Sequence, residues 1–221
     1  GGAEKSRERY LELHELEKVF TVLKQHQIQF TRDNYLAFAL LLTLGVRKNE
    51  LIAARWDEFN FQQQFWLLPA ERTKTSTAIC IPLPSVVVDW LMELKVRACG
   101  SDYLFPSRRS SKRREYISSD TLNHALAKMF GQKVDSNKQP TPDYIGQAGV
   151  SHFTIHDLRR TCRSLLASIG IQSHVAERCL NHKLKGVEGI YNRHDYLDER
   201  RDALNQLSDL LAPIINTRSE V

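Results

Sequence analysis

The feature that most constrains this chain is one long apolar run, from Tyr35 to Val46, which ends at Arg47. Its twelve residues include no charged side chain, so the run has no polar face to turn toward water and predicts a buried helix. A bilayer span needs about 20 such residues, so the run is too short to cross a membrane. We expect a helix over residues 33–44, stopped by Gly45, whose missing Cβ permits a left-handed cap.

The hydrophobic pattern elsewhere predicts a mainly helical chain with one small sheet. Between residues 59 and 82 the apolar residues fall in short runs separated by turn-forming residues, which predicts a three-stranded antiparallel sheet. Helical spacing predicts further helices at about 14–27, 85 to near 100, 119–130, 155–169, 174–181 and 197–211. The stretch 131–153 lacks such a period and predicts a long connection. With 221 residues, the chain can form a core without metal or disulfide support.

Charge and cysteine content narrow the class of protein. Lys and Arg outnumber Asp and Glu by 31 to 26, and the isoelectric point of about 9.0 favours a polyanionic partner. The four cysteines lack the density of a disulfide framework, so we expect a reducing, cytoplasmic location. We interpret Gly1 and Gly2 as a cloning remnant and expect the natural protein to extend further toward its N-terminus.

The segment from Thr154 to Asp157 has the pattern of a capping box, which predicts the start of a helix. His156 and Arg159 then share one face of that helix, close to its N-terminus. The free N–H groups and the positive end of the helix dipole both favour an anion there. The pair therefore outlines a phosphate site, and a solvated polar face is the ordinary alternative for so short a pattern.

Further residues suited to phosphate chemistry occur in a fixed order along the chain. Arg47 follows the buried run, Lys74 lies between the second and third predicted strands, and His182 ends the helix after the one that begins with His156. Tyr191 lies nine residues beyond His182. Taken together, Arg, Lys, His-x-x-Arg, His and Tyr at these spacings resemble the tyrosine recombinases, the phage-type integrases, over essentially the whole chain.

The stretch 180–204, LNHKLKGVEGIYNRHDYLDERRDAL, is most similar to the integrases of satellite phages and genomic islands. The resemblance implies that residues 1–221 form a catalytic domain and that the complete protein carries N-terminal DNA-binding domains. It implies cleavage and rejoining of double-stranded DNA at attachment sites through a 3′-phosphotyrosine, to integrate or excise a mobile element. A homotetramer on paired sites, associated with the bacterial nucleoid, is implied as well. Asn49 and Asn181 stand where the family frequently has glycine.

Each residue type suits attack on a phosphodiester. Arg47 and Arg159 can clamp the two non-bridging oxygens on which negative charge grows, so we expect neither metal nor cofactor. Tyr191 is the expected nucleophile, and His156 is its expected base. Lys74, crowded by arginines, is the expected acid that protonates the leaving 5′ oxygen.

Two supporting roles complete the expected site. His182 is expected to donate a hydrogen bond to a non-bridging oxygen, and Glu50 is spaced to orient Arg47. A basic run is a plausible contact for the DNA backbone, although such runs are ordinarily solvated loops. Its members are Arg108, Arg109, Lys112, Arg113 and Arg114.

Several assignments have rivals. Arg72 competes with Lys74, and Tyr196 competes with Tyr191, although a tyrosine directly before an amphipathic helix more often packs as an anchor. His182 could instead cap the C-terminus of its helix. Cys179 and His182 form a C-x-x-H pair without a second pair at zinc-finger spacing, so a metal site is not expected.

Three other function classes stay open. A type IB topoisomerase uses similar chemistry, but in that family lysine often occupies the position of His156. A DNA-binding module that has lost catalysis is the second alternative, although every expected catalytic residue type is present. A ribonuclease or metal nuclease would need clustered carboxylates, and none have convincing spacing.

Overall fold

The computed structural model describes residues 9–74, 76–108, 115–137, 139–182 and 195–216. The α-helices in this part of the chain are α1 (Leu13–Gln25), α2 (Arg32–Leu44), α3 (Lys48–Ile52), α4 (Ser85–Arg97), α5 (Thr121–Met129), α6 (Tyr144–Gln147), α7 (Ile155–Ser168), α8 (Ser173–Cys179) and α10 (Leu197–Asn216). Short 3-10 helices cover Trp56–Glu58 and Ala70–Arg72, and the strands are β1 (Phe59–Asn60), β2 (Phe65–Leu68) and β3 (Ile79–Pro82). The predicted class, mainly helical with a three-stranded sheet, is confirmed.

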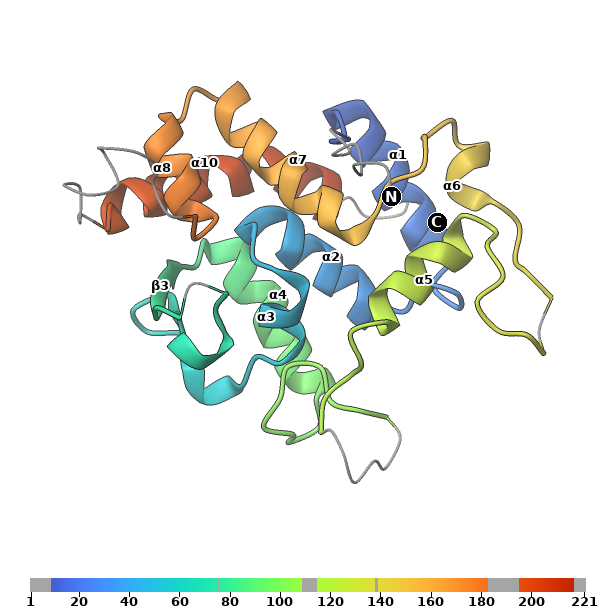
Figure 1. The fold of residues 1–221 in the computed structure, drawn as a ribbon, viewed down its shortest axis with the longest axis horizontal. Coiled ribbons are helices and arrows are strands. Elements are labelled where there is room, and N and C mark those ends of the chain that lie inside the picture. Colours follow the sequence, from blue (N-terminus) through green and yellow to red (C-terminus); the bar gives the residue numbers. More distant parts are fainter. Residues whose placement is uncertain (1–8, 75, 109–114, 138, 183–194, 217–221) are drawn as a thin grey trace, which may run out of the picture.

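The apolar run forms α2, which lies in the middle of the molecule (Figure 1). Its residues from Tyr35 to Leu44 are all buried, and it packs against α7, α4 and α10. The Tyr35 hydroxyl donates a hydrogen bond to the Ile215 carbonyl of α10, at 2.6 Å. The helix ends at Gly45, which has a φ of 61° and so forms the predicted left-handed cap.

The sheet is antiparallel, in the order β1-β2-β3, with Phe59 opposite Trp66 and Leu68 opposite Ile79. Strand β2 alternates as a half-buried strand does, because Trp66 and Leu68 are buried and Leu67 is exposed. Figure 1 shows the sheet on one side of α2, whereas α5 and α6 lie on its other side. The turn between β2 and β3 lies beside α3, because Arg72 in this turn donates a hydrogen bond to the Glu50 carbonyl at 2.9 Å.

Three elements differ from the expectation. Helix α10 continues past residue 211 through Pro213 to Asn216, because Ile215 stays in the core and Asn216 accepts a hydrogen bond from the Trp90 indole at 2.9 Å. The short helices α3 and α6 were not predicted, because five and four residues are too few to show a helical period. In the part of the chain that the structure describes, no helix has the length and apolar character of a membrane span.

Candidate active site

A pocket of about 720 Å³ lies where the starts of α3 and α7 meet the turn between β2 and β3. Four of the six predicted catalytic residues line it: Arg47, Lys74, His156 and Arg159. They come from segments far apart in the sequence, and the fold brings them to one hollow. The fifth, His182, contacts Arg159, and the sixth, Tyr191, lies outside the described residues.

Arg47 stands at the N-terminal end of α3, where its side chain and backbone are both held by Glu50. The Glu50 carboxylate accepts a hydrogen bond from the Arg47 guanidinium at 2.9 Å and another from the Arg47 backbone N–H at 2.8 Å. Glu50 is 2% exposed, whereas the Arg47 side chain is 25% exposed. The structure therefore contains the contact that the spacing predicted, with the guanidinium oriented at the pocket wall.

Arg159 of α7 is buried, so its face of the helix is not the solvated surface that a short motif ordinarily indicates. Its guanidinium donates to the carbonyls of Gly45 and Leu180 and to Nε2 of His182, the last at 2.9 Å. Among the described residues these contacts use three of the five N–H donors of a guanidinium. Burial and the charge of Arg47 lower the pKa of Arg159 to about 10, so the group remains a cation at pH 7.

His182 follows α8, whose last turn brings the ring back over the helix. Asn181 has a φ of 51°, and the His182 N–H donates to the Glu177 carbonyl at 2.9 Å while the Asn181 N–H donates to Arg178 at 3.0 Å. This pair of bonds is a Schellman ending, which needs a left-handed residue and tolerates asparagine there. Asn181 thus takes the backbone shape for which glycine is commonly used.

The carboxylate of Glu177 is a site residue that the sequence did not reveal. It accepts a hydrogen bond from Nδ1 of His182 at 2.6 Å, and its other oxygen pairs with Arg163 of α7 at 2.7 Å. Burial lowers the pKa of His182, and the hydrogen bond to Glu177 opposes that shift only in part. A spacing of five residues across a helix end has no periodic signature, so no pattern could have indicated this contact.

His156 is the second residue of α7 and is exposed at the pocket. Partial burial and the charges of Arg160 and Arg159 lower its pKa, which keeps the ring neutral at pH 7. The start of the helix is fixed by the predicted capping box: Asp157 accepts hydrogen bonds from the backbone N–H and the hydroxyl of Thr154, both at 2.8 Å. A neutral imidazole beside cations is the state in which a proton can be accepted.

Lys74 and its rival Arg72 both line the pocket, but they differ in their contacts. Arg72 donates to the Glu50 carbonyl at 2.9 Å and forms an ion pair with Glu58, so its guanidinium ties the turn to α3. Lys74 is exposed at the same turn. The structure thus gives Arg72 a structural explanation, which leaves Lys74 as the better candidate for an acid.

The remaining candidates lie apart from the pocket or outside the described residues. Tyr196 packs against the core, with its ring 4.7 Å from that of His174 between centroids, as a tyrosine anchor would. Arg108 is exposed and pairs with Asp33 at 2.8 Å, away from the pocket residues. The other members of the basic run, Arg109, Lys112, Arg113 and Arg114, lie outside the described residues.

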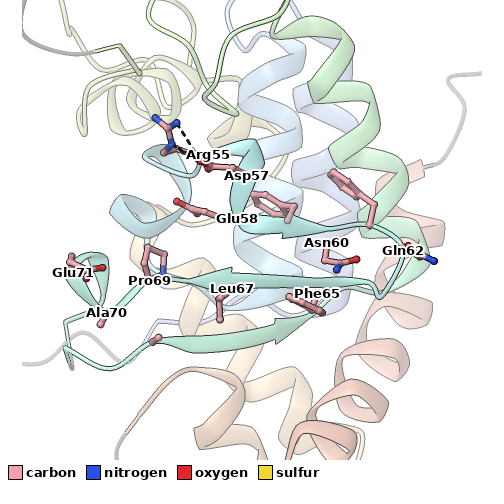
Figure 2. A pocket seen from close by; sticks show the side chains of 13 residues that line it. Arg55, Asp57, Glu58, Asn60, Gln62, Phe65, Leu67, Pro69, Ala70 and Glu71 are labelled. Carbon is pink, nitrogen blue, oxygen red and sulfur yellow. Dashed lines mark hydrogen bonds and ion pairs between the residues drawn. The ribbon is translucent and has the colours of Figure 1, made fainter.

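A second hollow, of about 970 Å³, lies over the outer face of the sheet, and Figure 2 shows Phe65 and Leu67 of β2 projecting into it. Its rim carries Glu58 and Glu71, and its Arg55 is paired with Asp57 (Figure 2). Carboxylates around an apolar floor repel a phosphate. None of the described catalytic candidates lines this hollow, so it is not the predicted site. Within the described part of the chain, no cluster of His, Cys, Asp or Glu could hold a metal ion.

Fold and pocket together define a mainly helical domain in which the cationic side chains of Arg47, Lys74 and Arg159 line one hollow. The model of the phage integrase family matches residues 9–197, and the chain belongs to this family. It is similar to prophage integrase IntA of Escherichia coli strain K12, with 32% identity over 172 residues, covering 77% of this chain. The chain spans 37% of the length of IntA.

Two solved structures have a similar fold. An integrase from mycobacterium phage Brujita has a TM-score of 0.63 at 16% identity, covering 96% of this chain and 65% of that chain. A lambda integrase tetramer bound to a Holliday junction has a TM-score of 0.57 at 20% identity, covering 84% of this chain and 51% of that chain. At these identities the likeness shows the fold alone.

Proposed function

We propose that the chain is the catalytic domain of a site-specific DNA recombinase, which cleaves and rejoins double-stranded DNA through a 3′-phosphotyrosine. The observation that carries the proposal is the gathering of Arg47, Lys74, His156 and Arg159 around one pocket. Membership of the phage integrase family supports it.

In the proposed reaction a scissile phosphate enters the pocket between Arg47 and Arg159. The phenolic oxygen of Tyr191 attacks phosphorus and gives its proton to His156, while the bond to the 5′ oxygen breaks and that oxygen takes a proton from Lys74. The two guanidiniums meet the charge that grows on the non-bridging oxygens. Rejoining reverses these steps, and the energy of the broken bond is kept in the tyrosyl ester, so no nucleotide is needed.

The proposal extends to the whole protein. We propose N-terminal DNA-binding domains ahead of this domain, a homotetramer on paired attachment sites, and integration or excision of a mobile element in a bacterial cytoplasm. The lambda integrase whose fold is similar has been solved as a tetramer bound to a Holliday junction, and IntA is named as a prophage integrase. The first supports the proposed tetramer, and the second supports the proposed action on a mobile element.

Nicked suicide duplexes test the proposed function. They carry the boundary sequences of the element that encodes the chain, and a nick beside the scissile phosphate lets the short fragment leave, so that the covalent intermediate accumulates. We expect a protein–DNA adduct that survives denaturation in detergent. Cleavage that leaves only unattached DNA ends, or no cleavage on any boundary sequence, would contradict the proposal.

A further inference from the structure

His182 stands between two charged partners whose chemistry fixes its proton. Arg159 can only donate hydrogen bonds, so Nε2 of His182, 2.9 Å from it, must accept. An ionised carboxylate can only accept, so Nδ1, 2.6 Å from Glu177, must carry the hydrogen. The two contacts agree on one neutral tautomer, with its lone pair directed toward Arg159.

That tautomer cannot perform the role expected of His182. A donor to a phosphate oxygen needs a hydrogen on Nε2, and the neutral ring described above has none there. A proton must therefore be added at Nε2 when a phosphate enters and Arg159 turns its donor toward it. A carboxylate on the opposite nitrogen favours this step, because it stabilises the imidazolium that forms.

We propose that Glu177 is a positioning residue for the recombination reaction: it holds His182 by Nδ1–H and supplies the negative charge that lets Nε2 take a proton from solvent and donate it in a hydrogen bond to the phosphate. This inference rests on the proposed function. Among the described residues, the charged groups that face the ring are Glu177 from α8, Arg159 from α7 and Arg47 at the start of α3. Both arginines oppose protonation, and Glu177 is the group among them that favours it.

Arg163 offers a purely structural alternative for Glu177. The ion pair between them, at 2.7 Å, joins α7 to α8, and Arg163 also donates to Ser173 at 3.0 Å. If this ion pair were the whole role of Glu177, loss of the Glu177 carboxylate would lower stability without altering the titration of His182. The experiment must therefore measure the imidazole itself.

Nitrogen NMR on the chain labelled with ¹⁵N-histidine measures the tautomer and the titration of His182 in the absence of DNA. We expect wild-type His182, identified by its absence from the spectrum of His182→Gln, to be neutral and protonated at Nδ1 at pH 7. In Glu177→Gln the amide keeps the shape but loses the charge, so proton affinity at Nε2 should fall about tenfold, the change that one pKa unit represents. An Nε2–H tautomer in the wild type, or an unchanged titration in Glu177→Gln, would overturn the proposal.

Glu93→Gln is the matched control. Glu93 accepts two hydrogen bonds from Arg32, at 2.8 and 2.7 Å, so this variant also removes a carboxylate paired with arginine, in a contact between α2 and α4. We expect it to lower the melting temperature and to leave the titration of His182 unchanged. A shift of that titration in Glu93→Gln as large as in Glu177→Gln would assign the effect to lost stability and refute the proposal.

Cleavage of the suicide duplex provides the second readout. The rate ratio of wild type to Glu177→Gln should be near one below the pKa of His182 and larger above it, because the variant loses its imidazolium at lower pH. In a His182→Gln background, Glu177→Gln should have no further effect on the rate. If Glu177→Gln lowered the cleavage rate by the same factor at every pH and in both backgrounds, the proposal would be refuted. If the wild type forms no adduct, the proposed function fails, while the NMR titration still decides the role of Glu177 toward His182.

Discussion

Arg47 and Arg159 carry the same charge but are held in different ways. Arg159 is buried and satisfies two carbonyls and a histidine nitrogen, whereas Arg47 lies at the pocket surface and its backbone N–H also contributes to the bond with Glu50. We expect Arg47→Ala and Arg159→Ala each to slow cleavage about a hundredfold or more.

The variants Arg47→Ala and Arg159→Ala should differ in stability. Arg159→Ala leaves buried acceptors without donors and should cost about 2 kcal/mol of unfolding free energy, while Arg47→Ala should cost less. Single-turnover adduct formation and thermal unfolding measure the two effects. A variant at Arg47 that cleaves at the wild-type rate would remove this arginine from the proposed site.

Lys74 is proposed as the acid, and leaving-group chemistry tests this role directly. Lys74→Ala should lose cleavage of an ordinary duplex and regain it when the bridging 5′ oxygen is replaced by sulfur, which leaves without protonation. Arg72→Ala should show no such rescue, because Arg72 anchors the turn to Glu58 and Glu50. Rescue of Arg72→Ala alone would show that the acid has been misassigned.

At the residue scale, the sequence predicts contacts that depend on local spacing and misses those that depend on a turn. Glu50 lies one helical turn after Arg47, and the pair was predictable from that spacing. Glu177 reaches His182 only because Asn181 adopts a left-handed backbone, which folds the chain back over α8. The contact between Glu177 and His182 could therefore be recognised only from the structure.

Among the elements, the end of α2 determines the geometry of the site. Gly45 has a φ of 61°, its carbonyl accepts from Arg159, and a Cβ there would lie 2.8 Å from Sγ of Cys162. Gly45→Ala should therefore suffer both backbone strain and a clash with α7, and lose about 2 kcal/mol or more of stability. Cleavage should fall as well, because the carbonyl that holds Arg159 moves.

Gly170, which follows α7, is the matched control. It has a φ of 84°, and a Cβ there would meet nothing within 4 Å, so Gly170→Ala should cost only the backbone strain, about 1 kcal/mol. Chemical denaturation compares the two variants. Equal losses of unfolding free energy in the two variants would show that the contact with Cys162 does not exclude a Cβ at position 45.

Long helices were predictable and short helices were not. The apolar run indicated α2 because it extends over enough residues to show that no face is polar, and the short apolar runs between turn-forming residues indicated the sheet. Helix α10 passes through Pro213, a residue that ordinarily ends a helix, so its last turn could be recognised only from the contacts of Ile215 and Asn216.

For the whole molecule, the net charge of +5 predicts DNA binding that weakens with salt. Each phosphate contact adds nearly one unit to the slope of log affinity against log salt. Replacing Arg108, Arg109, Arg113 and Arg114 by Gln should flatten this slope on unrelated duplexes. Arg32→Gln removes an arginine paired with Glu93 and should leave the slope unchanged. An unchanged slope in the fourfold variant would exclude the basic run from the DNA interface.

Mass spectrometry of the adduct formed on a suicide duplex in the presence of EDTA tests the central claim most directly. We predict that one peptide carries the nucleotide, that the modified residue is Tyr191, and that Tyr191→Phe binds DNA but forms no adduct, since it lacks only the attacking oxygen. Tyr196→Phe should form the adduct normally. Attachment at Tyr196, or activity lost in EDTA and restored by magnesium, would contradict the proposed tyrosine mechanism.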